Sequence, residues 1–419
     1  MREFISSRRG NIALTGAVAL PCAFFLITSG VDYAAVSSQR SLLQSVADKA
    51  ALASARELII AQDAIVESGN DSRITSVASS VVTAHIGPSH ATTAQVIDSG
   101  TAVEVTIVMS RQTYFNSPFA AGETQISAKA VAEAAGAGNI CLVGLNTKSA
   151  TSLHMGRGAR ISAGSCVVYS NSQSATSLTM AATARLSAEL ICVSGGVHSL
   201  VPETNFTHGK PVHDCPVFDD PLIDRPMPDK LAPCTAKGLS LQAGDDVQLK
   251  PGTYCGGINN AGGIVRLSPG VYIMRDGPLR VDGGGSLLGE DVGIFLTGPD
   301  SQVLLNAKSH VSLSAPRDGD MAGMLIFEDR TIPVPKGHFF SSDDARNLVG
   351  TIYFPNSKLT INAQNPIADQ SAYTVILAAE FDLESGPELV LNTDYSGSDV
   401  PVPSGIGNNS TPAQPRLVR

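Results

Sequence analysis

Six of the seven cysteines of this 419-residue chain are spread over one stretch, and they are its most obvious candidates for chemistry. A zinc site would need close pairs such as C-x-x-C, but the shortest spacing here is nineteen positions, between Cys215 and Cys234. An even number of widely spaced cysteines in an oxidising compartment predicts up to three disulfides, whose connectivity the sequence leaves open. The candidate disulfide cysteines are Cys141, Cys166, Cys192, Cys215, Cys234 and Cys255.

Histidines offer a weaker candidate for a metal site. His208 and His213 have an H-x4-H spacing and are followed by Asp214 and Cys215, so four possible ligands lie close together in the chain. However, helical zinc sites use H-x3-H, this stretch is rich in proline, and Cys215 is expected to be oxidised. We therefore expect neither a metal nor a cofactor. Among the other histidines, His154 and His198 are expected to be exposed strand residues and His310 and His338 isolated ones.

Pairs of acids could serve a glycosidase or a polysaccharide lyase, because such enzymes need two carboxylates on one face. Most of the acids here adjoin glycine or proline, where aspartate favours a turn, and adjacent acids on a strand point to opposite faces. The chain also has no Trp and only 8 Tyr with which to stack sugars. We predict a protein without catalytic residues, with a glycan-recognising adhesin or a polysaccharide-processing enzyme as the alternative. The acids considered are Asp219, Asp220, Asp245, Asp246, Asp282, Glu290 and Asp291.

Composition excludes nucleic acid as a partner. The formal net charge is -9, and charged residues make up only 16% of the chain. Binding to a phosphate backbone needs clustered lysine and arginine, and no such cluster occurs. The partners expected are a membrane and other proteins.

Residues 12–31 have the composition of a transmembrane helix. They include no ionisable side chain apart from the thiol of Cys22, and twenty residues of helix span about 30 Å, the thickness of a bilayer's hydrocarbon core. Arg2, Arg8 and Arg9 precede them, so residues 1–11 are expected to stay cytoplasmic and the rest to be exported. A cleaved secretory signal would need a shorter apolar core, and a prepilin signal would need an acid in place of Thr15.

Residues 32–135 are expected to form a small α+β stalk domain. Apolar residues recur at three- and four-residue steps over 32–64, which predicts a helix, and a second helix is expected over 72–85. Alternation of apolar residues over 103–109 and 126–132 has the period of two that half-buried strands show. A run of alanine and glycine at 134–138 marks the boundary with the next domain.

A parallel β-helix is predicted for residues 139–395. Residues 151–163 and 176–188 are 25 positions apart and identical at eight of thirteen positions, and repetition at this period indicates a solenoid. Short apolar strands separated by glycine turns continue to residue 315. Stacking buries a core that one coil cannot bury alone. A β-sandwich would also have many short strands, but it would not explain the repeat. Residues 201–233 and 329–347 are expected to be loops that leave the stack, and 396–419 to be a flexible tail.

The N-terminal region resembles a known family. The segments RRGNIALTGAVALP (8–21) and GVDYAAVSSQRSLLQSVADKAALASA (30–55) are similar to the opening of the TadE/TadG-like family of Flp (Tad) pilus-assembly proteins, with Lys49 where alanine is usual. The segments ICLVGLN (140–146), GTIYFPNSKLTI (350–361) and NTDYSGSDVPVP (392–403) resemble TadG-related proteins.

The resemblance implies a role, a location and partners. The chain is expected to be a single-pass protein of the bacterial inner membrane, with a periplasmic or extracellular C-terminal ectodomain. It would assist the assembly of a pilus or surface appendage through contacts with other pilus-assembly or envelope proteins. The family offers no catalytic residues to transfer.

Overall fold

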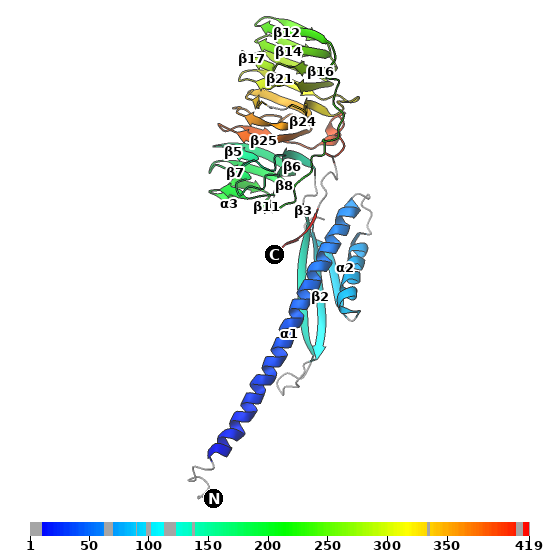
Figure 1. Cartoon of the computed structure of the whole chain (residues 1–419), viewed down its shortest axis with the longest axis vertical. Coiled ribbons are helices and arrows are strands. Elements are labelled where there is room, and N and C mark those ends of the chain that lie inside the picture. The colour runs from blue at the N-terminus through cyan, green and yellow to red at the C-terminus, as the bar shows by residue number, and fades with distance from the viewer. Residues whose placement is uncertain are drawn as a thin grey trace. The chain divides into compact units, whose positions relative to one another are not determined.

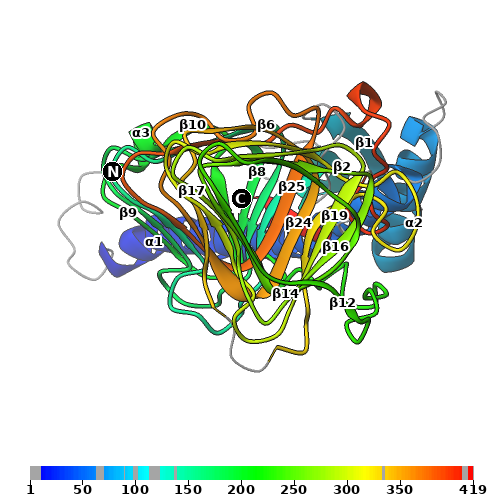
Figure 2. The same cartoon turned by 90° about the horizontal axis from the view of Figure 1, so that it is seen from above.

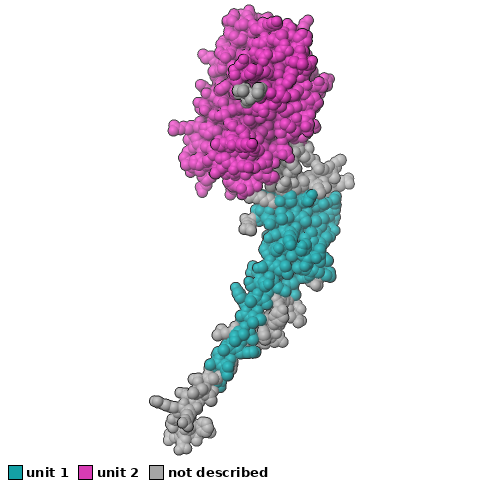
Figure 3. Space-filling view, in the orientation of Figure 1, with its two compact units in different colours: residues 1–135, 413–419 teal, residues 136–412 magenta. Residues whose placement is uncertain are grey.

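The computed structural model describes residues 11–62, 70–88, 90–97, 102–112, 123–135, 139–332, 336–407 and 414–418. The chain divides into two compact units, coloured separately in Figure 3. Unit 1 comprises residues 1–135 together with 413–419, and unit 2 comprises residues 136–412.

Unit 1 packs two helices on one face of an antiparallel sheet. Its helices are α1 (Asn11–Gln62) and α2 (Asn70–Ile86), and its strands are β1 (Ala91–Ile97), β2 (Ala102–Gln112), β3 (Glu123–Ala135) and β27 (Gln414–Val418), in the order β1-β2-β3-β27. Alternate residues of the strands, such as Val103, Val105 and Ile107, face Leu43 and Ile74 of the helices in one buried cluster. The two predicted strands and the second predicted helix therefore lie within β2, β3 and α2, and the first predicted helix matches α1 as far as Gln62, its last two residues lying outside the described ranges.

The C-terminal end of the chain differs from the flexible tail that was predicted. Strand β27 pairs antiparallel with β3, with Arg416 opposite Glu133 and Val418 opposite Val131. Val400 and Ile406 of the preceding segment are buried in the core of unit 2. A polar composition indicated flexibility, but pairing with a strand about 280 positions earlier leaves no local signal in the sequence. Strand β1 was missed because apolar and polar residues do not alternate regularly in its sequence ATTAQVI.

Unit 2 is a parallel β-solenoid of about ten turns, as predicted, and not a β-sandwich. Viewed from above, its coils lie over one another (Figure 2). The first coils are formed by β4 (Ile140–Gly144), β5 (Leu153–Met155), β6 (Arg160–Ser170), β7 (Leu178–Met180), β8 (Arg185–Val193), β9 (Val197–Ser199), the short helix α3 (Pro202–Asn205), β10 (Phe206–His208) and β11 (Pro211–His213). The later coils are formed by β12 (Cys234–Gln242), β13 (Asp246–Leu249), β14 (Gly252–Ala261), β15 (Ile264–Leu267), β16 (Gly270–Arg275), β17 (Leu279–Asp282), β18 (Ser286–Gly289), β19 (Val292–Thr297), β20 (Val303–Leu305), β21 (His310–Ser314), β22 (Met324–Glu328), β23 (His338–Phe340), β24 (Asp344–Ile361), β25 (Thr374–Leu383) and β26 (Glu388–Val390).

The 25-residue repeat corresponds to two coils stacked in register. Leu153 pairs with Leu178 and Met155 with Met180, at an offset of 25 residues. The next strands keep the same offset, since Ile161 pairs with Leu186. The leucines and methionines of both copies are buried. Identical residues recur because each position meets its own equivalent in the neighbouring coil.

The coils do not stack in the order of the sequence. The chain enters the solenoid near its middle at β4, and its first coils proceed through β6 to β8 at one end. It then crosses to the other end, where β12 begins, and returns coil by coil through β14, β16, β19, β22 and β24 to β25. Strand β25 finally pairs with β4, with Ile376 opposite Leu142. We call this junction between β25 and β4 the seam. In Figure 1 the orange β24 and β25 lie next to the teal β5 and β6 there.

Residues 216–233, which we call the strap, make the crossing between the two ends. The strap does not leave the stack as predicted: Phe218 and Leu222 are buried in the solenoid core. Strands β4, β19 and β22 of the stack are buried along their whole length, so both faces of the sheet are covered there. The prediction of a loop over 329–347 was also wrong in part, because β23 and the start of β24 pair within the stack.

Candidate functional site

Helix α1 combines two surfaces of opposite character. In its later part, Leu43, Val46 and Ala50 are among the residues buried in unit 1. Nearer its start, described apolar side chains are exposed, including Leu20 at 73%, Phe24 at 63% and Ile27 at 66%. Burying such side chains is favourable by roughly 1.5–3 kcal/mol each. This first part of α1 therefore presents apolar surface for which the described fold provides no cover.

No helix among the described residues has both the length and the mean hydropathy needed to cross a membrane. The span predicted for residues 12–31 stays a prediction.

The structure joins the six candidate cysteines in three pairs: Cys141–Cys166, Cys192–Cys215 and Cys234–Cys255. The first pair joins neighbouring strands β4 and β6. The other two lie at the two ends of the strap: Cys215 fastens its start to β8, and Cys234 fastens its end to β14. Two of the three disulfides therefore hold the segment that connects the ends of the solenoid. Cys22 is exposed on α1 as a free thiol.

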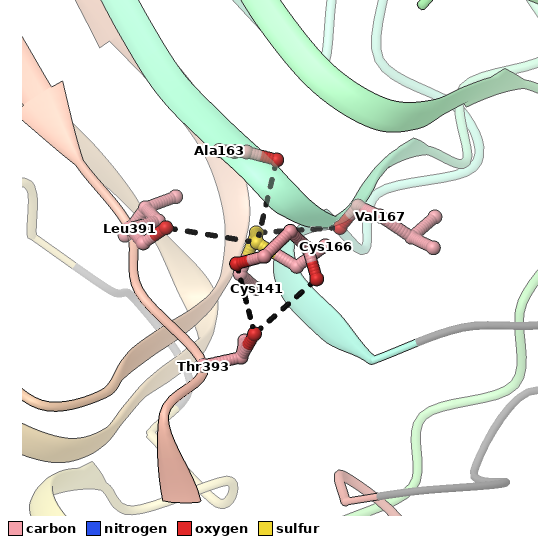
Figure 4. Close-up of a disulfide and its surroundings, with 7 residues drawn as sticks. Cys141, Ala163, Cys166, Val167, Leu391 and Thr393 are labelled. Atoms are coloured by element: carbon pink, nitrogen blue, oxygen red, sulfur yellow. Dashed lines mark hydrogen bonds between the residues drawn. A yellow bond between two sulfur atoms is a disulfide. The ribbon is translucent and has the colours of Figure 1, made fainter. Parts of the chain in front are cut away.

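The Cys141–Cys166 disulfide lies beside the seam between the first and last coils (Figure 4). The Cys166 sulfur is 3.7 Å from the carbonyl oxygen of Leu391, which follows β26. Nearby, the Thr393 hydroxyl donates to the carbonyl oxygen of Ser165. Since Leu391 and Thr393 follow the last coil of the chain and Cys166 is in an early one, this cluster fixes coils about 225 positions apart in the sequence.

Buried side chains of the solenoid bind the backbone of the strap near its start. The Asn171 side chain donates to the Phe218 carbonyl at 2.7 Å and accepts from the Phe218 N–H at 2.8 Å. The Tyr169 hydroxyl donates to the carbonyl of Pro216, and burial raises the pKa of Tyr169 to about 12. This hydroxyl therefore keeps its proton over the physiological pH range. The polar groups here serve to fix the strap.

A second set of contacts holds the middle of the strap. Burial raises the pKa of Asp220, and hydrogen bonds from Tyr353 and Leu222 and the charge of Arg330 offset part of that rise. Burial and the adjacent carboxylate also raise the pKa of Tyr353. Arg330 donates to the carbonyls of Leu222 and Arg225 at 2.7 and 2.6 Å. In the sequence Asp220 stood out only as a possible catalytic acid, since Tyr353 and Arg330 are more than 100 positions away from it.

Asp329 anchors the last part of the strap. It is 2% exposed, and its carboxylate accepts hydrogen bonds from Thr297, Thr331 and Lys230. Burial alone would raise the pKa of Asp329, but these hydrogen bonds outweigh it and lower the pKa. Lys230, whose side chain is partly exposed, belongs to the strap. Lys230 and Asp329 therefore form an ion pair that joins the strap to the segment directly after β22.

The residues of the histidine cluster lie on β10, on β11 and in the turn that follows. His208 and His213 are exposed at the ends of β10 and β11, Asp214 occupies a turn with φ of 57°, and Cys215 is in a disulfide. Across the described part of the chain, no group of three or more His, Cys, Asp or Glu side chains is placed to hold a metal ion.

His154, His198, His310 and His338 lie on strands, and three of them contact acids. His154, which is partly exposed, lies 2.7 Å from Asp382 of the neighbouring coil, and His198 is exposed on β9. The expectation that His310 and His338 are isolated was wrong. His310 lies 2.7 Å from Asp344, and the buried His338 lies 3.3 Å from Glu328. Register between coils places His154 beside Asp382 and His310 beside Asp344, so these two pairs indicate stacking, whereas Glu328 and His338 belong to the consecutive strands β22 and β23.

The remaining candidate acids take part in turns and exposed ion pairs. Asp245 accepts from the Gln242 N–H, Asp282 from the Gly283 N–H and Asp291 from the Arg317 N–H. Asp246 forms an ion pair with Arg266 at 3.3 Å. Asp219 and Glu290 are exposed. In each described contact the carboxylate stabilises a turn or a pair of coils.

Comparison with protein families found one match, and it coincides with α1. Residues 10–57 match the model of the TadE/G-like family of Flp pilus-assembly proteins (Tad). The search of curated proteins and the search of solved structures each found no match. The match includes the exposed apolar part of α1 and the part buried in unit 1. Residues 10–57 of this chain therefore match the TadE/G-like family model, as their resemblance predicted.

Proposed function

We propose that this chain is a non-enzymatic envelope protein, anchored in the bacterial inner membrane by the first part of α1. It takes part in the assembly of an Flp-type pilus or surface appendage through protein–protein contacts. The observation that carries this proposal is the family match over residues 10–57. The segment it covers is a single continuous helix from Asn11.

Anchoring is supported by the composition and exposure of α1. Residues 12–31 contain no charged side chain, and the apolar side chains of Leu20, Phe24 and Ile27 are exposed. A lipid bilayer suits a single apolar helix, because the hydrocarbon core of the bilayer accepts apolar side chains around the whole helix. Arg2, Arg8 and Arg9 on the N-terminal side favour export of the remainder.

A structural role for unit 2 is supported by the contacts of its polar residues. Asp329 and Arg330 bind the strap, Asp220 of the strap accepts a hydrogen bond from Tyr353, and the acids considered for glycosidase chemistry stabilise turns. The expected partners are other pilus-assembly or envelope proteins, which is what the family match suggests.

The anchoring is tested by placing charge on the exposed apolar part of α1. The double variant Leu20→Arg/Phe24→Arg should leave the membrane fraction, because each arginine at the centre of a span costs about 3 kcal/mol. Leu42→Arg is the matched control: Leu42 is on the same helix and 53% exposed, but it lies beyond the proposed span. Retention of the double variant in the membrane fraction would contradict the anchor.

The assembly role is tested by recovery of partners. The full chain should be solubilised in mild detergent and purified from cells that express the pilus system, after cross-linking. We expect components of that system to be enriched over a purification of the Leu20→Arg/Phe24→Arg variant. Recovery of glycan alone, without pilus or envelope proteins, would favour the adhesin alternative.

A further inference from the structure

The Cys234–Cys255 disulfide has a cation against both of its sulfur atoms. One guanidinium nitrogen of Arg275, Nη2, lies 3.0 Å from Cys234 Sγ and 2.9 Å from Cys255 Sγ. The other, Nη1, donates to the strap carbonyls of Lys230 and Ala232 at 3.1 and 3.0 Å. Arg275 therefore holds the end of the strap and the disulfide at once.

This disulfide is also more accessible than the other two. Cys141, Cys166 and Cys192 are 0% exposed and Cys215 is 5% exposed, whereas Cys234 and Cys255 are both partly exposed. Attack on a disulfide requires that a thiolate reach a sulfur atom in line with the S–S bond. The burial of the first two pairs hinders that approach, and the partial exposure of Cys234 and Cys255 permits it.

The position of Arg275 favours the products of reduction. A guanidinium stays protonated at all physiological pH values, and a neighbouring cation lowers the pKa of a cysteine thiol. A thiol with a lower pKa leaves faster in thiol–disulfide exchange. Because Arg275 touches both sulfurs, either Cys234 or Cys255 would leave as a thiolate beside a fixed positive charge.

We propose that Cys234–Cys255 is a site of selective thiol–disulfide exchange with an external dithiol. A thiolate of the dithiol attacks one of the two sulfurs, the S–S bond breaks, and the other sulfur leaves as a thiolate next to Arg275. The second thiol of the reagent then displaces the first cysteine and closes the reagent's own disulfide. Two electrons and two protons pass from the dithiol to Cys234 and Cys255.

Exchange at this site would release one end of the strap. Cys215 would still fasten the start of the strap to β8, but its far end would be held by non-covalent contacts alone, among them those of Arg275 and Lys230. Strand β12, which begins at Cys234 and pairs with β14 at the end of the stack, would lose its covalent link. The reduced state would therefore differ at the terminal coil, with the seam between β4 and β25 left intact.

The selectivity is tested on the purified full chain under native conditions. The protein is treated with increasing dithiothreitol, quenched with iodoacetamide, and mapped by mass spectrometry for alkylation at each of the six cysteines. We expect Cys234 and Cys255 to be alkylated first, while the other pairs stay protected. Reduction of Cys141–Cys166 or Cys192–Cys215 first, or of all three at the same concentration, overturns the proposal.

The part of Arg275 is tested by two variants that separate its charge from its hydrogen bonds. Arg275→Lys keeps the positive charge but loses the guanidinium hydrogen bonds to the carbonyls of Lys230 and Ala232. Arg275→Gln loses both the charge and these hydrogen bonds. We expect reduction of Cys234–Cys255 to be about tenfold slower in Arg275→Gln than in Arg275→Lys, because a lower leaving-group pKa speeds exchange. Equal rates in the two variants, whether faster or slower than wild type, overturn the electrostatic role. The result does not depend on the proposed assembly role.

Discussion

Replacing Leu178 with alanine tests whether the coils of the solenoid stack in the register described. Leu178 is 0% exposed and lies between Leu153 of one neighbouring coil and Val197 of the other. Its side chain therefore packs against equivalent positions above and below. The adjacent residue, Thr179, points to the opposite face of the same strand and is partly exposed.

The expected loss of stability follows from burial. Leucine-to-alanine substitutions in a well-packed core cost about 3–5 kcal/mol, because apolar contact is lost and a cavity remains. The total unfolding free energy of a domain is about 5–15 kcal/mol, so the loss is a large part of it. Thr179→Ala removes a hydrogen bond to the Thr176 carbonyl and should cost no more than about 1 kcal/mol.

Urea unfolding followed by tyrosine fluorescence is a suitable assay. The chain has no Trp, and six of its 8 Tyr lie in residues 136–412, so the signal reports mainly on unit 2. With a denaturant slope of about 3 kcal/mol per molar urea, Leu178→Ala should lower the transition midpoint by about 1–1.7 M. Thr179→Ala should shift it by less than about 0.3 M by the same relation.

Two outcomes would refute the reasoning. Equal shifts for the two variants would mean that Leu178 and Thr179 are buried alike, which a strand in this register does not allow. A shift below about 0.3 M for Leu178→Ala would mean that the coils of the repeat do not pack on each other there.

Three further predictions concern the strap and one turn. Asn171→Ala should lower stability by about 2–4 kcal/mol in the same urea assay, because the N–H and C=O of Phe218 lose their partner; a loss under about 0.5 kcal/mol would show that the strap is held by other contacts. Asp329→Asn should destabilise the protein at pH 7 but less so as the pH falls from about 4 through the lowered pKa of Asp329, where the wild-type carboxylate also becomes protonated; an unchanged difference between the midpoints at pH 7 and pH 3 would contradict the lowered pKa. Gly257→Ala should disrupt the turn inside β14 at which the strand passes from pairing with β16 to pairing with β17, since its φ is +75° and an added Cβ would lie 2.1 Å from the Pro278 carbonyl oxygen; a circular dichroism melting curve like that of wild type would contradict this.

Local patterns in the sequence carried the prediction of the solenoid and of the helices. Alternation of apolar residues shows which side chains face the core, and the repeat of 25 residues shows the length of a coil. Both signals arise within a few dozen residues, and the structure aligns Leu153 with Leu178 at that offset. The family segment over residues 10–57 was likewise recognisable from adjacent residues.

The candidate site was predicted less completely than the fold. The sequence indicated that six cysteines would form disulfides, but not which pairs, since the pairing depends on which coils are neighbours. It gave no sign that Asn171, Arg275 or Arg330 bind the strap, because each of these side chains meets backbone carbonyls more than 40 positions away. A carbonyl acceptor is present at every residue, so it leaves no trace in composition.

The order of the coils was decided by tertiary structure alone. Any of these coils presents a similar row of apolar residues and unpaired backbone groups, so a strand pattern does not state which coil will lie above it. The first coil and the last pair at Leu142 and Ile376. The strap binds Asn171, Tyr353 and Asp329, which come from different coils, so its path depends on the order of the coils. The sequence by itself determined that the coils would stack; long-range pairing between complementary edges, about 230 positions apart, determined where the stack begins, closes and is fastened.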